Sequence, residues 1–118
     1  MAFRICRLKN IIKSIHILGT SVAELTRQQA FIESRLLEHQ RESTRLDNEL
    51  DDGKINATVW ATKTDILDVL IDEAQNLIDE LGSKIKAKEE ERAQKEAELN
   101  YFSSEEINRV LKNLGLSE

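Results

Sequence analysis

The sequence contains no proline, only four glycines and a single cysteine, and aromatic residues make up 4% of it. Without proline, only the glycines and a few turn-forming polar residues can interrupt a helix. A single cysteine excludes an intramolecular disulfide and favours a reducing compartment. Together these shortages are typical of long helices and argue against a compact globular core.

Long apolar runs are also absent. No apolar stretch approaches the ~20 residues that a membrane-spanning helix needs, and Lys13 and His16 interrupt the segment that would have to be the apolar part of a secretory signal. We therefore expect an intracellular protein, with the cytoplasm as the simplest location. A mitochondrial presequence is the alternative, because positions 1–23 hold four basic residues and no acidic one.

The sequence contains no Gly-rich phosphate loop, CxxC pair, HExxH or GxSxG motif. His16 and His39 stand apart, and neither follows a glutamate at the spacing of di-metal helix bundles. Asp65, Asp72 and Asp79 recur every seven residues, a pattern more typical of a solvated helix face than of a divalent-ion site. We predict no catalytic residue, no metal ligand and no cofactor, and therefore a non-enzymatic protein.

What the chain does contain is helical periodicity. From Leu8 to Leu50, apolar or small side chains recur at alternating intervals of three and four residues, which is the pattern of a helix that packs along another helix. A second run with this spacing extends from Ala57 to Ile85. Between the two runs, the segment 51–55 has the chemistry of a tight turn, and Asn56 is a candidate N-cap. The two runs predict an antiparallel helical hairpin.

We therefore predict an all-α fold and a single helical domain over residues 1–118. Its long helices cover about 4–50 and 56–101, residues 21–101 form the hairpin with its turn at 51–55, and a short terminal helix covers about 104–114. Gly19 and the capping box of Ser21 and Glu24 predict that the first helix is bent or broken near 19–21. A straight helix is the alternative.

The two ends of the chain carry apolar faces of their own. Residues 3–18 form a basic amphipathic helix whose apolar face Arg4 interrupts, and the terminal helix begins with a capping box of Ser103 and Glu106 and ends at Gly115. The simplest arrangement packs these two apolar faces on each other, and the alternative is a detachable docking helix. The residues of the two faces that we expect at a partner interface are Ile5, Leu8, Ile12, Ile107, Leu111 and Leu114.

The second long helix has more apolar surface than one facing helix can cover. Ile66, Val69, Leu70 and Leu77 lie beside its row of core positions, and we expect them to contact a partner. That partner is a second copy of the chain or a different protein.

We interpret the chain as a structural or adaptor subunit that assembles with itself or with other proteins of a larger complex. One alternative is a peripheral membrane or organelle-directed protein that uses residues 3–18 on a membrane surface. Another is an acidic inhibitor or mimic whose face between Asp65 and Glu80 binds a basic site. We do not expect nucleic-acid binding, because bases and acids are balanced in residues 84–98 and aromatic residues are absent there.

Overall fold

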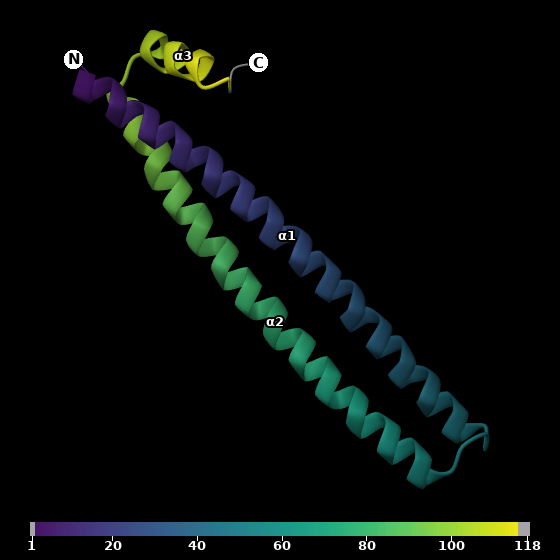
Figure 1. Ribbon diagram of the computed structural model, residues 1–118. Coiled ribbons are helices and arrows are strands. Elements are labelled where there is room, and N and C mark those ends of the chain that lie inside the picture. The colour runs from purple at the N-terminus through teal and green to yellow at the C-terminus, as the bar shows by residue number, and fades with distance from the viewer. Residues whose placement is uncertain (1, 116–118) are drawn as a thin grey trace. The chain divides into compact units, whose positions relative to one another are not determined.

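The computed structural model describes residues 2–115, and every secondary-structure element in that range is helical. Helix α1 spans Ala2–Asp51 and helix α2 spans Ala57–Glu98 (Figure 1). A short 3-10 helix, η1, follows at Leu99–Tyr101, and helix α3 spans Ser104–Asn113. The predicted all-α fold of two long helices joined as a hairpin, with a short C-terminal helix, is confirmed.

Of the bend or break that we predicted near residues 19–21, the break is wrong, because α1 is continuous from Ala2 to Asp51. Gly19 is not among the glycines with positive φ, so it keeps a right-handed helical conformation. The Thr20 hydroxyl donates to the His16 carbonyl at 3.0 Å and so bonds within α1 instead of starting a new helix. A single glycine costs a helix only about 1 kcal/mol relative to alanine, which a long packed helix tolerates.

The turn between α1 and α2 lies where the sequence predicts it. Gly53 has a φ of 74°, a left-handed conformation that glycine adopts without strain. The Lys54 N–H donates to the Glu49 carbonyl at 2.9 Å and closes the end of α1. The Asn56 side-chain oxygen accepts from the Val59 N–H at 2.8 Å, which confirms Asn56 as the N-cap of α2.

Helix α3 has both of its predicted end signals. The Ser103 hydroxyl accepts from the Glu106 N–H, and the Glu106 carboxylate accepts from the Ser103 N–H, each at 3.2 Å. This is the reciprocal capping box, and it satisfies two backbone donors at the start of the helix. Gly115, with a φ of 72°, follows the helix end and confirms the predicted terminator.

The chain divides into two compact units. The hairpin unit is Leu25–Ser83, and the terminal unit combines the residues up to Glu24 with those from Lys84 onward. The boundaries of the units fall inside α1 and α2, at positions where the sequence has no linker.

In the hairpin unit, α1 and α2 pack along a single row of core positions. Leu46 is 1% exposed, and Leu67, Ala74 and Leu81 are buried on α2. Burial of each leucine side chain contributes about 1.5–3 kcal/mol. The core is narrow, because each helix supplies only one row of buried residues to it.

One polar residue of this row, Gln29, is bonded across the pair of helices. Gln29 donates from Nε2 to the Ile78 carbonyl at 3.1 Å, so a polar side chain at a core position does not lose its hydrogen bond. Near the turn, the Trp60 indole N–H donates to the Asp47 carboxylate at 2.8 Å. These two bonds establish which levels of α1 and α2 face each other in this unit.

In the terminal unit, α3 packs on the N-terminal part of α1. Leu8, Ile12 and Val110 form a buried cluster, and five partly buried residues pack against it. The arrangement predicted from the two uncovered apolar faces is therefore the one observed. The five are Leu99, Phe102, Ile107, Leu111 and Leu114.

Candidate functional site

The candidate site is a row of exposed apolar side chains on α2 in the hairpin unit. We define the α2 stripe as Val59, Ile66, Leu70 and Leu77, all of which are exposed, Ile66 to 59%. Their spacings of seven and four residues place them on one side of the helix. The predicted residue Val69 is also exposed, one position further around the helix from Leu70.

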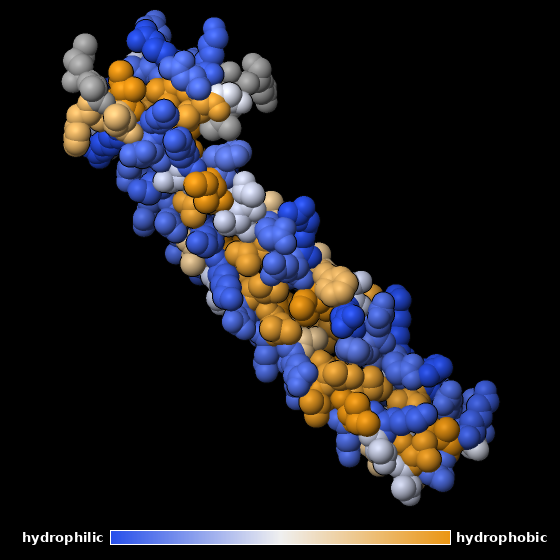
Figure 2. All heavy atoms as spheres, viewed as in Figure 1, coloured by the Kyte–Doolittle hydropathy of each residue, from blue (hydrophilic) through white to orange (hydrophobic). Residues whose placement is uncertain are grey.

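The stripe runs beside the core row, the buried and half-buried heptad positions of the two helices. On α1 these are Gln29, Ile32, Leu36, His39, Ser43 and Leu46, and on α2 they are Trp60, Thr64, Leu67, Ile71, Ala74, Ile78 and Leu81. Each of its members directly precedes a core-row residue of α2; Ile66, for example, precedes the buried Leu67. In an antiparallel pair, the residues that directly precede the core rows of both helices lie on the same side of the pair. Figure 2 shows apolar side chains gathered along the line between α1 and α2 in this unit.

Helix α1 adds Phe31 to this surface. Phe31 directly precedes Ile32 of the α1 core row and is 60% exposed. The bond from Gln29 to the Ile78 carbonyl shows which levels of α1 and α2 face each other. Phe31 is therefore at about the same level as Leu77 on the neighbouring helix. The Arg35 guanidinium lies over the Phe31 ring, 5.1 Å from its centroid, in a cation–π contact.

The charged side chains on this side of the hairpin unit come from both helices. Arg35 on α1 and Glu73 on α2 each precede a core-row residue, and they lie at about the same level. Among residues 2–115, neither forms an ion pair with an opposite charge. Glu42 is on the same side of α1 and forms an ion pair with Arg45.

In the terminal unit, most of the predicted partner-binding residues are covered by other residues of the same unit. Leu8 and Ile12 are buried in the cluster with Val110, and Ile107, Leu111 and Leu114 are partly buried against it. These five predicted residues are therefore covered by the chain itself. Of the predicted residues in this unit, Ile5 alone remains exposed.

Arg4, which interrupts the apolar face of residues 3–18, connects α1 to α3. Its guanidinium donates to both carboxylate oxygens of Glu106, at 2.9 and 3.2 Å, and to the Tyr101 carbonyl at 2.9 Å. It also lies 4.8 Å from the centroid of the Phe102 ring. The hydrogen bond from Arg4, followed by that from the Ser103 backbone, lowers the pKa of Glu106 from 4.5 to about 2.

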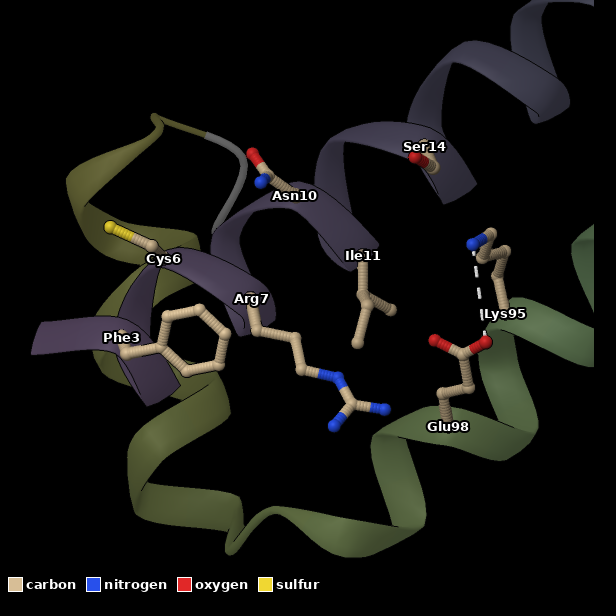
Figure 3. A pocket seen from close by; sticks show the side chains of 8 residues that line it. All are labelled: Phe3, Cys6, Arg7, Asn10, Ile11, Ser14, Lys95 and Glu98. Atoms are coloured by element: carbon tan, nitrogen blue, oxygen red, sulfur yellow. Dashed lines mark ion pairs between the residues drawn. The ribbon is translucent and has the colours of Figure 1, made fainter. Parts of the chain in front are cut away.

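The terminal unit also contains an open hollow of about 340 Å³. In Figure 3 the Arg7 side chain lies between Phe3 and Glu98, and a dashed line marks the ion pair of Glu98 with Lys95 at 3.9 Å. Cys6, a free and exposed thiol, is one of the residues that line the hollow. Within residues 2–115, no three histidine, cysteine or acidic side chains are grouped so that they could hold a metal ion. The full lining is Phe3, Cys6, Arg7, Asn10, Ile11, Ser14, Lys95 and Glu98.

Comparisons of the chain with protein-family models, with curated proteins and with solved structures find no match. None of the helices in the described range is long and apolar enough to cross a membrane. Evidence about function therefore comes from the surfaces of the two units.

Sequence reasoning found four residues of this surface and missed Phe31 and Val59. Both directly precede core-row residues, as Ile66 and Leu70 do, so the signal was present in the heptad pattern. Both residues lie outside the segment between Ile66 and Leu81, where the apolar face of the sequence pattern is widest.

Proposed function

We propose that this protein is a non-enzymatic helical-hairpin subunit that assembles with other protein chains through the α2 stripe. The observation that carries the proposal is the exposure of Ile66, Leu70 and Leu77 on one side of α2, with Phe31 of α1 at the same level as Leu77. Contiguous exposed apolar surface of this kind marks interaction sites, whereas single exposed apolar residues are ordinary.

The geometry of the stripe supports a helical partner. A row with spacings of four and seven residues matches the ridge that a helix presents to another helix. The unit already holds two helices side by side, and a third or fourth helix laid along the stripe would complete a bundle. We infer that the partner contributes one or more helices.

The test replaces two stripe residues in the full-length chain. With Leu70→Glu/Leu77→Glu, we expect the native mass of the protein in cell extract, measured by size-exclusion chromatography, to fall to that of a monomer. Far-UV circular dichroism of the purified variant should stay near that of the unchanged protein, because neither residue is in the core row.

The matched control is Leu37→Glu. Leu37 is 47% exposed and Leu77 45%, but Leu37 follows its core-row residue and so lies on the other side of the pair. The control should keep the native mass. The proposal fails if the doubly substituted stripe leaves the mass unchanged, or if Leu37→Glu lowers it as much.

A membrane surface is a second candidate, supported by a different part of the molecule. In the terminal unit, Phe3 and Tyr101 are largely exposed, and Arg7, Lys9 and Lys13 are exposed on α1. Exposed aromatic residues beside basic ones suit the headgroup region of an anionic bilayer. Co-sedimentation with vesicles containing anionic lipid would test this, since Phe3→Ser/Tyr101→Ser should lose binding and Phe31→Ser should not.

A further inference from the structure

We propose that the occupant of the α2 stripe is a second copy of the same hairpin unit, in a two-fold dimer in which α1 of each copy lies on α2 of the other. The inference rests on the proposed function, because it assumes that the stripe is an interface.

The apolar residues fit this arrangement. A two-fold axis parallel to the helices leaves every residue at its own level and places α1 of one copy over α2 of the other. Phe31 lies at about the level of Leu77 within one chain, so it reaches the level of Leu77 of the second copy as well. The 60% of Phe31 that is exposed can then enter a core between the copies.

The directions of the helices fit too. In this arrangement α1 is antiparallel to α2 of its own copy and to α2 of the other copy. Every neighbouring pair in the resulting four-helix bundle is antiparallel, which is the up-and-down arrangement of simple bundles. The interface is the same patch on both copies, as two-fold symmetry requires.

The charges distinguish this arrangement from the other two-fold possibility. Arg35 and Glu73 lie at about the same level on the stripe side, so the Arg35 of each copy meets the Glu73 of the other. Both are exposed and have no ion-pair partner within residues 2–115. Opposite charges that flank an apolar seam between helices set partner choice and orientation.

The alternative axis, perpendicular to the helices, places α2 on α2. If Leu70 of one copy then lies level with Leu77 of the other, the two Glu73 side chains fall at the same level near the axis. Like charges facing each other across an interface destabilise it. The pair formed by Arg35 and Glu73 therefore favours α1 on α2.

The experiment reverses the two charges separately. We expect the purified full-length chain to dimerise, measured by sedimentation equilibrium, and Arg35→Glu and Glu73→Arg each to raise the dissociation constant at least about tenfold. An equimolar mixture of the two variants should dimerise again, because both charged pairs between the two different chains are then opposite. The double variant Arg35→Glu/Glu73→Arg should also recover the dimer.

Matched controls make the same reversals away from the stripe. Asp72→Arg changes the acid next to Glu73, and Arg41→Glu changes an arginine on the outer side of α1; both residues are exposed. These variants should dimerise as the unchanged chain does. Circular dichroism of all variants confirms that helicity is retained.

Three results would overturn the inference: a chain that stays monomeric at every concentration, single reversals that dimerise normally, or a mixture that does not recover dimerisation. None of them decides the proposed function. A purified monomer with a larger, stripe-dependent mass in cell extract would show that the stripe binds a different protein. If the native mass in cell extract is the same for the unchanged chain and for the stripe variant, the proposed function itself is refuted.

Discussion

The terminal unit and the hairpin unit are built from the same two helices, but they treat their excess apolar surface in opposite ways. In the terminal unit, α3 covers the apolar face of α1 and forms a cluster around Leu8, Ile12 and Val110. In the hairpin unit no third helix is present, and Ile66 and Leu70 remain exposed beside a narrow core. A pair of helices buries one row of side chains each, so wider apolar faces need a further helix.

The two units also differ in how they use a polar residue that interrupts an apolar pattern. Arg4 lies at the exposed edge of the terminal cluster and connects α1 to α3 through Glu106 and the Tyr101 carbonyl. Gln29 lies inside the core row of the hairpin unit and bonds to the Ile78 carbonyl. Both residues lower the regularity of the pattern, and both add a specific contact between elements.

The largest expected effect comes from replacing a fully buried leucine in either unit. Leu46 in the hairpin unit and Leu8 in the terminal unit are each 1% exposed, and replacing either with alanine should lower the free energy of unfolding by about 2–5 kcal/mol. Leu46→Ala should shift urea unfolding followed by Trp60 fluorescence. Leu8→Ala should instead speed amide hydrogen exchange in residues 104–113, because α3 loses its packing. Unchanged exchange in α3 would show that the cluster does not hold that helix.

A smaller effect should follow from removing the helix caps. Asn56→Ala and Ser103→Ala each remove a side chain that accepts a backbone N–H, at a cost of about 0.5–2 kcal/mol. The cost should be more visible in α3, because a helix of 10 residues is marginal without its cap and its packing. Site-resolved amide exchange measures both, and Ser104→Ala serves as the neighbouring control. Equal protection of α3 in Ser103→Ala and in the control would contradict the role of the cap.

The two glycines within the helices allow a finer comparison. A Cβ added at Gly19 would meet the Arg92 guanidinium at 3.5 Å, which is ordinary contact, so Gly19→Ala should stabilise the chain by about 0.5–1 kcal/mol. A Cβ at Gly82 would lie 3.3 Å from Gln29 Nε2 and would press on the bond from Gln29 to Ile78. Gly82→Ala should therefore raise the stability of the chain by less than Gly19→Ala does. Thermal unfolding at one protein concentration compares the two, and a larger gain from Gly82→Ala would refute this account.

The smallest effect should be the pH dependence of the contact between Arg4 and Glu106, because both side chains are exposed to solvent. The pKa of Glu106 is lowered from its usual 4.5 to about 2 in the folded chain. The ionised carboxylate therefore stabilises α3 fully at pH values above 4.5. That stabilisation should be lost as pH falls from about 4.5 to about 2. The carboxyl chemical shift of Glu106 measures its titration directly.

The controls for this titration are Arg4→Ala and Glu105→Gln. Arg4→Ala should return the Glu106 pKa toward its usual value, since the hydrogen bond from Arg4 is the largest cause of the shift. Glu105 is also in the first turn of α3, but it is not the residue that Arg4 contacts, so Glu105→Gln should leave the titration unchanged. A Glu106 pKa that stays low without Arg4 would assign the shift to the capping box alone.

Much of the fold follows from local signals in the sequence. The turn at 51–55, the Asn56 cap, the capping box of Ser103 and Glu106 and the Gly115 terminator involve residues within a few positions of one another. Such signals act through the nearby backbone, so they can be recognised without knowing the fold. The same reasoning was less successful at Gly19, where local signals predicted a bend or a break and α1 continues without a break, as the longer periodic pattern indicates.

The candidate site was only partly predictable. The exposure of Ile66, Val69, Leu70 and Leu77 follows from an apolar face wider than one helix can cover. The position of Phe31 beside them depends on which level of α1 faces which level of α2, and the bond from Gln29 to Ile78 reveals that level. Sequence periodicity gives the side of a helix but leaves the sliding of one helix along the other undetermined.

By itself the sequence determined the turn at 51–55 and the caps of α2 and α3, which side of each helix is apolar, and that some apolar surface would exceed the needs of a simple hairpin. Only the tertiary structure decided which of that surface is covered within the chain. It assigns Leu8, Ile12, Ile107, Leu111 and Leu114 to an internal cluster and leaves the α2 stripe exposed. The physical reason is range: caps and periodicity act over a few residues, whereas Arg4 and Glu106 meet across a separation of 102 residues that only folding can close.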